Sequence, residues 1–206
     1  MSWVSGGLGV LASWWACASA RRTVEDLRLS GPVWAERGVS DQWGVAMVLA
    51  VVVGTAMFSL SEPVLVLFAW CTVFFSLVDL DTHAVPLGAS RLATVASMVV
   101  VMSTSTATGA SVVEVCLGGV VAPVAVAVVR LCSRGDLGGG DVAVAPLIGM
   151  HTAWTAWSDA LVALGAGFAL AGAFAVMGIA TNRLTRRSHI PMVPFLFAGA
   201  WVCVLR

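Results

Sequence analysis

The chain has 206 residues, of which 59% are hydrophobic and only 11% are charged, and its eleven basic residues balance its eleven acidic ones. Soluble globular domains carry about 25% charged residues, so this composition excludes an ordinary soluble domain and favours a polytopic membrane protein. With no net charge there is no bulk attraction to nucleic acid, and the expected surroundings are a lipid bilayer.

Eight apolar segments are candidates for membrane-spanning helices, since a bilayer core needs about 20 residues per helix. In chain order they are residues 3–20, 44–60, 63–80, 86–103, 110–131, 141–157, 160–181 and 190–205. The second and sixth are short, and the weak join between the sixth and the seventh leaves a seven-helix arrangement open. The predicted fold is an all-α transmembrane bundle of about eight helices that forms one domain over residues 1–206.

The first apolar segment ends in "ACASA", which looks like the small-residue cleavage site of a signal peptide. A signal peptide carries basic residues before its apolar stretch, whereas here Arg21 and Arg22 follow it. We therefore expect a retained first helix with its N-terminus outside the cell. Residues 21–43, which come next, are too few to form a core and are predicted to be a short cytoplasmic loop.

The positions of the arginines test this topology, because basic residues concentrate in cytoplasmic loops. If the first helix ends inside, only Arg206 falls outside. The ten arginines at inner loops and helix ends are Arg21, Arg22, Arg28, Arg37, Arg91, Arg130, Arg134, Arg183, Arg186 and Arg187.

Three aspartates fall at the cytoplasmic ends of predicted helices. Asp79 and Asp81 end the third segment and Asp141 begins the sixth. Carboxylates at a membrane edge are costly, so they are candidates for a functional role. Two Asp groups about 3 Å apart share one proton, so that one can activate water while the other protonates the carbonyl under attack. This chemistry is aspartic proteolysis, which needs no metal and no cofactor.

Asp79 and Asp81 cannot both pair with Asp141, because residues two apart on a helix are separated by about 200° of rotation. Before Asp141, the glycines Gly138, Gly139 and Gly140 are expected to adopt backbone angles closed to other residues and to place Asp141 at a helix N-terminus. A plain glycine turn is the alternative interpretation of this stretch.

Three stretches resemble the type IV prepilin peptidases, a family of membrane aspartic peptidases. "VDLDTHAVP" resembles the first signature, in which a catalytic Asp precedes an apolar-Pro pair; here these are Asp79 and Pro86. "GGGDVAVAPLIG" is similar to the G-x-G-D signature, and "HIPMVPFLFAGAW" to the closing segment. The stretches follow the family's order and cover roughly residues 60–206.

The resemblance implies an eight-helix endopeptidase of the inner (plasma) membrane with its active site facing the cytoplasm. Its substrates would be prepilin-like precursors, whose short basic leader it removes. Asp79 and Asp141 would be the catalytic pair, Gly138 and Gly140 the flanking glycines, and Asp81 a supporting residue.

The sequence also departs from the family. Bifunctional members carry a large insert after the first helix, often with paired C-x-x-C zinc motifs, and methylate the new N-terminus. Here residues 21–43 replace that insert and the five cysteines are scattered, so neither a zinc site nor N-methylation is expected. Leu87 stands where the family has a polar residue.

Other interpretations stay open. The three aspartates could simply mark helix ends. The chain could be a proton- or cation-coupled transporter, although its acids gather at one face instead of at the midplane. It could also be an inactive membrane subunit of a pilus or secretion assembly.

Overall fold

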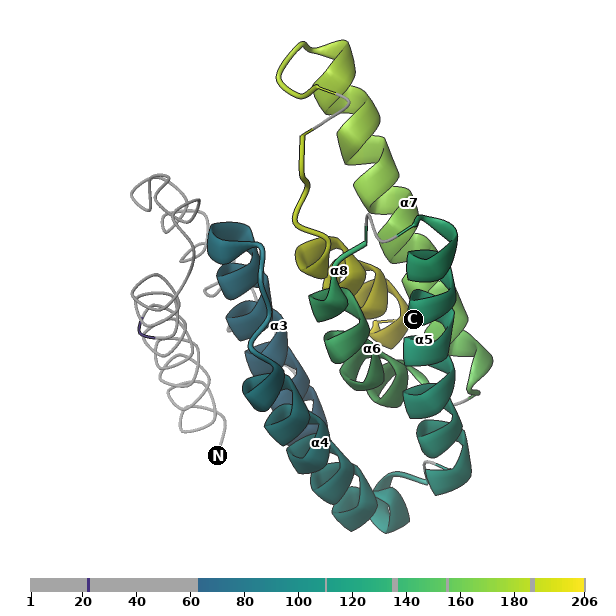
Figure 1. Ribbon diagram of the computed structural model, residues 1–206. Coiled ribbons are helices and arrows are strands. Elements are labelled where there is room, and N and C mark those ends of the chain that lie inside the picture. The colour runs from purple at the N-terminus through teal and green to yellow at the C-terminus, as the bar shows by residue number, and fades with distance from the viewer. Residues whose placement is uncertain are drawn as a thin grey trace. The chain divides into compact units, whose positions relative to one another are not determined.

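The computed structural model describes residue 22 and residues 63–109, 111–134, 137–154, 156–185 and 188–205. The predicted spans 3–20 and 44–60, the outside N-terminus and almost all of the predicted loop 21–43 lie outside these residues. In the described part every regular element is an α-helix (Figure 1). The helices are α3 (Pro63–Thr82), α4 (Leu87–Thr108), α5 (Val112–Cys132), α6 (Gly139–Thr152), α7 (Ser158–Ala180) and α8 (Val193–Val204).

Four of these helices, α3, α4, α5 and α7, are long and apolar enough to cross a membrane. The prediction of a helical membrane protein is therefore confirmed for the described part of the chain. The other two, α6 and α8, have 14 and 12 residues. At 1.5 Å per residue they extend about 21 and 18 Å, less than the roughly 30 Å of a hydrocarbon core.

The chain divides into two compact units, Met1–Val85 and Pro86–Arg206. In the first unit the described helix is α3, and more than half of its large side chains are buried. Phe68, Phe75 and Val78 are fully covered. Phe74 stacks on Trp70 with ring centroids 5.3 Å apart and meets Phe75 edge-on at 5.1 Å. These contacts lie within α3 and order its aromatic side chains.

In the second unit α6 is the central helix. It packs against α4, α5, α7 and α8, and nine of its 14 residues are buried. Successive helices run in opposite directions, so the starts of α4, α6 and α8 lie toward the same side of the unit as the ends of α5 and α7, although α7 projects well beyond the others (Figure 1). We call this the arginine end, because Arg91, Arg130, Arg134 and Arg183 lie there, and we call the opposite end, with Trp154 and Trp157, the tryptophan end.

Two helix pairs of the second unit cross at glycines. Between α5 and α6, a Cβ on Gly149 would overlap the carbonyl group of Gly118 and lie 2.8 Å from the Cβ of Ala122. Between α7 and α8, Gly167 and Gly199 approach each other in the same way. Small residues allow close backbone approach, which is how membrane helices gain packing energy where burial from water contributes little.

Two helix boundaries differ from those predicted. The span expected at residues 86–103 continues as α4 to Thr108, through part of the "STSTATG" stretch that suggested a loop. The hydroxyls of Ser103 and Thr104 donate to the carbonyl of Val100, at 2.8 and 2.9 Å, so these polar side chains are satisfied inside the helix. The span expected at 141–157 starts earlier and stops at Thr152.

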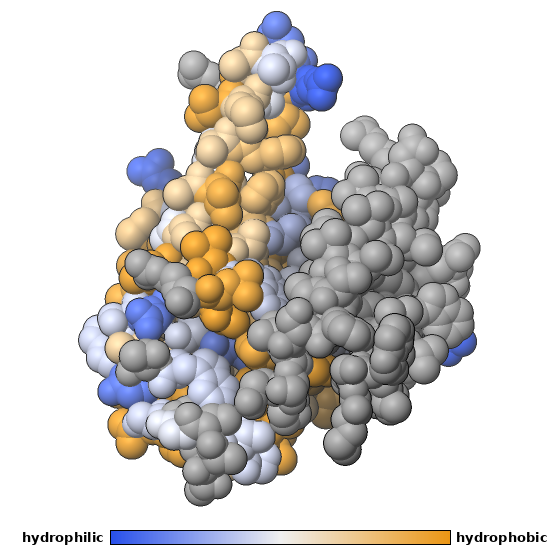
Figure 2. Space-filling model, turned by 180° about the vertical axis from the view of Figure 1, so that it is seen from behind, coloured by the Kyte–Doolittle hydropathy of each residue, from blue (hydrophilic) through white to orange (hydrophobic). Residues whose placement is uncertain are grey.

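The outer surface of the second unit is apolar along its long helices. On α5 the exposed side chains Val113, Val120, Val124 and Val128 recur at helical spacing. Figure 2 shows hydrophobic residues along the projecting stem of α7 and hydrophilic residues at its tip. Such a surface is compatible with a lipid surrounding.

Candidate active site

The first predicted motif lies at the end of α3. The helix continues through Asp79 and Asp81 and ends at Thr82, whose hydroxyl donates to the carbonyl of Val78 at 2.7 Å. His83 then adopts a left-handed conformation with φ 51°, and its N–H donates to the carbonyl of Asp79 at 2.9 Å. This bond closes the last helical turn and holds the backbone of Asp79 in place.

The two aspartates of this turn differ in burial. Asp79 is 7% exposed, whereas Asp81 is partly exposed. Because the helix is continuous, the two side chains leave it in different directions. The side chain of Asp79 therefore lies on a covered face of α3. Burial distinguishes it from Asp81, which the sequence left as an alternative partner of Asp141.

The second motif forms the start of α6. Gly138 is the N-cap residue, Gly139 and Gly140 are the first two helical residues, and Asp141 is the third. Asp141 is 5% exposed. Its carboxylate lies in the first turn, where the partial positive charge of the helix N-terminus stabilises an anion.

The glycines of this motif place Asp141 in the first turn of α6, as expected, but they do so without unusual backbone angles. Gly138 has φ −63° and ψ 150°, which other residues also adopt, and Gly139 and Gly140 are helical. Among the described glycines only Gly109, which lies elsewhere, has a positive φ. The prediction of unusual backbone angles is therefore wrong.

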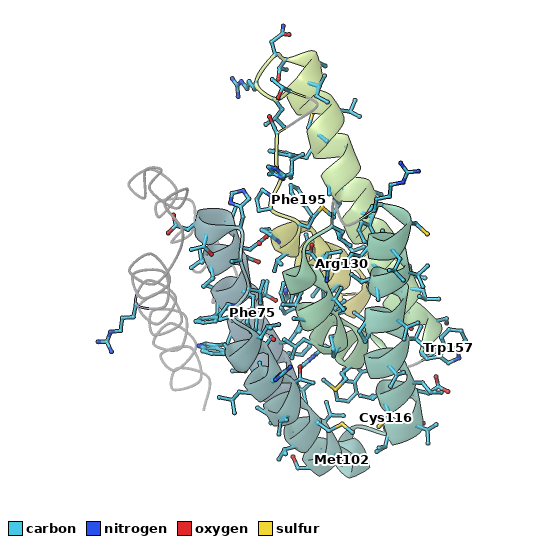
Figure 3. All side chains as sticks on the ribbon, viewed as in Figure 1. Phe75, Met102, Cys116, Arg130, Trp157 and Phe195 are labelled. Atoms are coloured by element: carbon cyan, nitrogen blue, oxygen red, sulfur yellow. The ribbon has the colours of Figure 1, made fainter. Side chains whose placement is uncertain are left out.

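What these glycines provide is space for two charged side chains. A Cβ on Gly138 would lie 3.2 Å from Oδ2 of Asp141, so the carboxylate folds back against the N-cap residue. A Cβ on Gly139 would lie 3.1 Å from Nη1 of Arg130 and 3.7 Å from its Cζ. Arg130 comes from the last turn of α5 and lays its guanidinium over the first turn of α6 (Figure 3).

Contacts between helices relate the ends of α5, α6 and α7 to one another. The N–H of Trp157, the N-cap residue of α7, donates to Oε2 of Glu114 in the first turn of α5 at 2.7 Å. This bond ties the starts of α5 and α7 together next to the end of α6. The level of the α6 start follows from the crossing of Gly118 and Gly149. From that crossing α5 continues about 21 Å to Cys132, whereas α6 extends about 15 Å back to Gly139, so the first turn of α6 starts about 6 Å short of the end of α5.

Pro86, the remaining residue of the first motif, belongs to the start of α4. Its carbonyl accepts the N–H of Ser90 at 3.1 Å, which places Pro86 at the N-cap of that helix. Proline is suited to a helix start because it has no N–H to satisfy. The structure thus groups Gly138, Gly139, Gly140 and Asp141 in one turn of α6. Pro86 belongs to the same unit as this turn but to a different helix, and Asp79 and Asp81 belong to the first unit.

Arg130 and Glu114 are the two residues whose contacts were not predicted from the sequence. Each contacts a segment that is distant in the sequence. The sequence signal that could have suggested these contacts is that each charged residue lies within one turn of the end of an apolar helix, a position that favours anchoring contacts.

No set of three or more His, Cys, Asp and Glu side chains that could hold a metal ion is found in the described residues. His151 is fully buried near the tryptophan end of α6, and its Nδ1 is 2.8 Å from the carbonyl of Leu147. This contact lies within α6 itself.

Comparison of the chain with protein-family models, with curated proteins and with solved structures found no match.

Proposed function

We propose that this protein is a membrane aspartic endopeptidase that removes the leader of type IV prepilin-like precursors at the cytoplasmic face of the plasma membrane. In this proposal the chain forms eight transmembrane helices with its N-terminus outside. Asp79 and Asp141 form the catalytic pair and no cofactor takes part.

One observation carries the proposal. Among the carboxyl groups of the described residues, Asp79 and Asp141 alone are buried, at 7% and 5% exposure. Asp81, Glu114 and Asp159 are all partly exposed. Burying a carboxyl group costs free energy, so the two buried groups need a reason to be there. They are also the two aspartates that the resemblance to prepilin peptidases selects.

The chain connection is a second support. Only four residues, 83–86, link the end of α3 to the start of α4. The start of α4 lies at the arginine end of the second unit, where α6 and its Asp141 also begin. The proposed pairing therefore needs no long loop to bring the ends of α3 and α6 to one membrane face.

In the proposed reaction one carboxylate draws a proton from water, and the resulting nucleophile attacks the scissile carbonyl carbon. The other carboxyl donates its proton to the carbonyl oxygen. Collapse of the tetrahedral intermediate breaks the C–N bond and the departing amine takes up a proton. Two carboxyls in contact divide these roles because they cannot both be ionised.

The test is co-expression with candidate small prepilins, followed by mass measurement of their N-termini. We expect the wild-type protein to remove a leader and both Asp79→Asn and Asp141→Asn to leave the precursor intact. Glu114→Gln and Asp159→Asn are matched controls, because each removes a partly exposed carboxyl from the tryptophan end. Both controls should retain cleavage.

A second measurement addresses the pairing itself. In a background without the native cysteines, Asp79→Cys and Asp141→Cys together should form a disulfide on mild oxidation, whereas Asp81→Cys with Asp141→Cys should not. Intact precursors beside the wild-type protein at normal membrane levels would contradict the proposal. Proton movement by the purified protein in liposomes, without cleavage, would favour the transporter.

A further inference from the structure

The C-terminal half of α7 extends beyond the helix that packs most closely against it. α7 crosses α8 at Gly167 and Gly199. From that crossing α7 continues about 20 Å to Ala180, whereas α8 extends only about 9 Å back to Val193. The end of α7 therefore lies about 11 Å beyond the start of α8, and this part of α7 projects from the second unit (Figure 1).

The projecting part, residues 170–180, is apolar, and we call it the α7 stem (Figure 2). Its exposed large side chains are Leu170, Phe174, Val176, Met177 and Ile179. At about 100° of rotation per residue, these side chains point to several sides of the helix. A single helix packed alongside would cover one side only, whereas lipid chains can surround the stem.

The stem ends in a folded turn, which we call the α7 tip (residues 181–185). Asn182 has φ 54°, the left-handed conformation that is common just past a helix C-terminus. The N–H groups of Arg183 and Leu184 both donate to the carbonyl of Gly178 at 2.9 Å. A Cβ on Gly178 would overlap the side chain of Leu184, so the glycine allows Leu184 to fold back onto the stem. Leu184 is half-buried there, whereas Arg183 is exposed.

The charge at the tip is positive. The sequence contains no Asp or Glu after Asp159, and Arg183 forms no ion pair with another described residue. The hydroxyl of Ser188 accepts the N–H of Thr185 at 3.0 Å and lies 3.1 Å from the hydroxyl of Thr185. Two further arginines lie between these residues in the sequence. Guanidinium and hydroxyl groups are donors that bind phosphate oxygens.

The length of α7 places the tip at the level of the lipid headgroups. With 23 residues the helix extends about 34 Å, slightly more than the roughly 30 Å of a hydrocarbon core. The exposed Trp157 directly precedes α7, and tryptophan is enriched at membrane interfaces. With its start at one interface, α7 reaches the opposite headgroup layer at its tip.

We propose that the α7 stem and the α7 tip together form a docking surface for an anionic phospholipid of the leaflet at the arginine end. The tip binds the phosphate headgroup through Arg183 and the neighbouring hydroxyls, and the stem contacts the acyl chains. An anionic lipid fits better than a zwitterionic one, because the choline cation of the latter would face the arginines. The surface is separate from the proposed catalytic pair and does not depend on peptidase activity.

Native mass spectrometry of the purified full-length protein measures this preference, because it counts bound lipids and reports the oligomeric state. Phosphatidylglycerol or phosphatidylcholine with the same acyl chains is added to the protein in detergent. We expect the wild type to bind phosphatidylglycerol at least about fivefold more tightly. Arg183→Gln should lower this preference by about fivefold, since one arginine beside anionic lipid contributes about that factor. Arg183→Lys keeps the charge and should retain most of the preference.

Arg91→Gln is the matched control, because Arg91 is also exposed at the arginine end but lies on α4. It should keep the wild-type preference. Gly178→Ala tests the folded turn without a change of charge, since the added methyl group displaces Leu184 and should weaken phosphatidylglycerol binding. Gly172→Ala, where a Cβ would meet no atom within 4 Å, should bind lipid as the wild type does.

Three results would overturn the proposal. The first is equal binding of the two lipids by the wild type, or equal losses in Arg183→Gln and Arg91→Gln. The second is displacement of the lipid by an equal concentration of glycerol phosphate, which lacks acyl chains and would indicate a site for free phosphate. The third is a lipid-free dimer as the main species, which would show that a second copy of the chain covers the stem.

Discussion

Asp79 and Asp81 show how helix geometry gives neighbouring residues different environments. They are two positions apart on a continuous helix, so one lies on the covered face and the other at its margin. The sequence motif alone favours Asp79 by counting from Pro86, and the burial of the two side chains favours the same residue for an independent reason.

For Asp81→Asn we expect leader cleavage to fall by less than about tenfold, since general acid–base groups typically contribute 100-fold or more. For Asp79→Asn the loss should exceed about 100-fold for the same reason. Initial rates at equal membrane levels measure the difference. A larger loss in Asp81→Asn than in Asp79→Asn would transfer the catalytic role to Asp81.

His83 is the residue whose backbone conformation is most constrained near the site. Its φ of 51° suits glycine, and a β-branched residue there meets the left-handed penalty of about 1–2 kcal/mol. We expect His83→Val to lower the unfolding midpoint of the purified protein in detergent and His83→Gly to leave it within error or raise it. Equal midpoints for the two variants would show that this turn relaxes at no cost.

At the scale of the helices, the glycine crossings determine how closely α5 approaches α6 and α7 approaches α8. A side chain at any of these positions would overlap the facing helix, so the two backbones would have to move apart to accommodate it. The crossing of α5 and α6 also sets the distance between Arg130 on α5 and Gly139 at the start of α6.

We therefore expect Gly149→Val to destabilise the protein by about 1–3 kcal/mol or more, as overpacking of a filled interior does. Gly172→Val is the matched control, because position 172 is also within a helix and has open space around it. Thermal unfolding of both variants in the same detergent provides the comparison. Equal destabilisation would mean that helix propensity, and not the crossing, determines the cost.

Apolar segment length predicted the helices of the described chain well, because one strong signal, hydropathy, determines them. Segment length failed to predict the ends of two helices. Ser103 and Thr104 were expected in a loop, yet their hydroxyls donate to a carbonyl within α4. The helix expected to reach Trp157 ends earlier, and the N–H of Trp157 donates to Glu114 instead.

In the candidate site, the motif aspartates and glycines could be found from the sequence, but the reason for the glycines could not. It depends on Arg130 contacting Gly139 from another helix, and the order of residues contains no direct signal for such a contact.

At the scale of the whole molecule, the arginines predict which face of the membrane is cytoplasmic. In the second unit the described arginines Arg91, Arg130, Arg134 and Arg183 share one end, as the positive-inside rule requires of helices that alternate in direction. The proposed active site faces the same side as this end.

Cysteine labelling tests this orientation. Cys132 is exposed at the arginine end of α5, and Ser158 is exposed at the tryptophan end, at the start of α7. In proteins reduced to one cysteine, a membrane-impermeant maleimide added to intact cells should label Ser158→Cys and spare Cys132. Disruption of the cells should expose Cys132. The reverse pattern would invert the topology and place Asp141 on the outer face.

The shortness of α6 and α8 has a consequence for the membrane around the second unit. Helices of 14 and 12 residues cannot span a bilayer whose thickness suits α5 and α7, so beyond their ends water must enter the unit from one side or the surrounding bilayer must thin. Either change would bring water to the proposed catalytic pair. Acyl-chain length then becomes a determinant of turnover: reconstitution in shorter-chain phospholipids should accelerate cleavage, and longer chains should slow it.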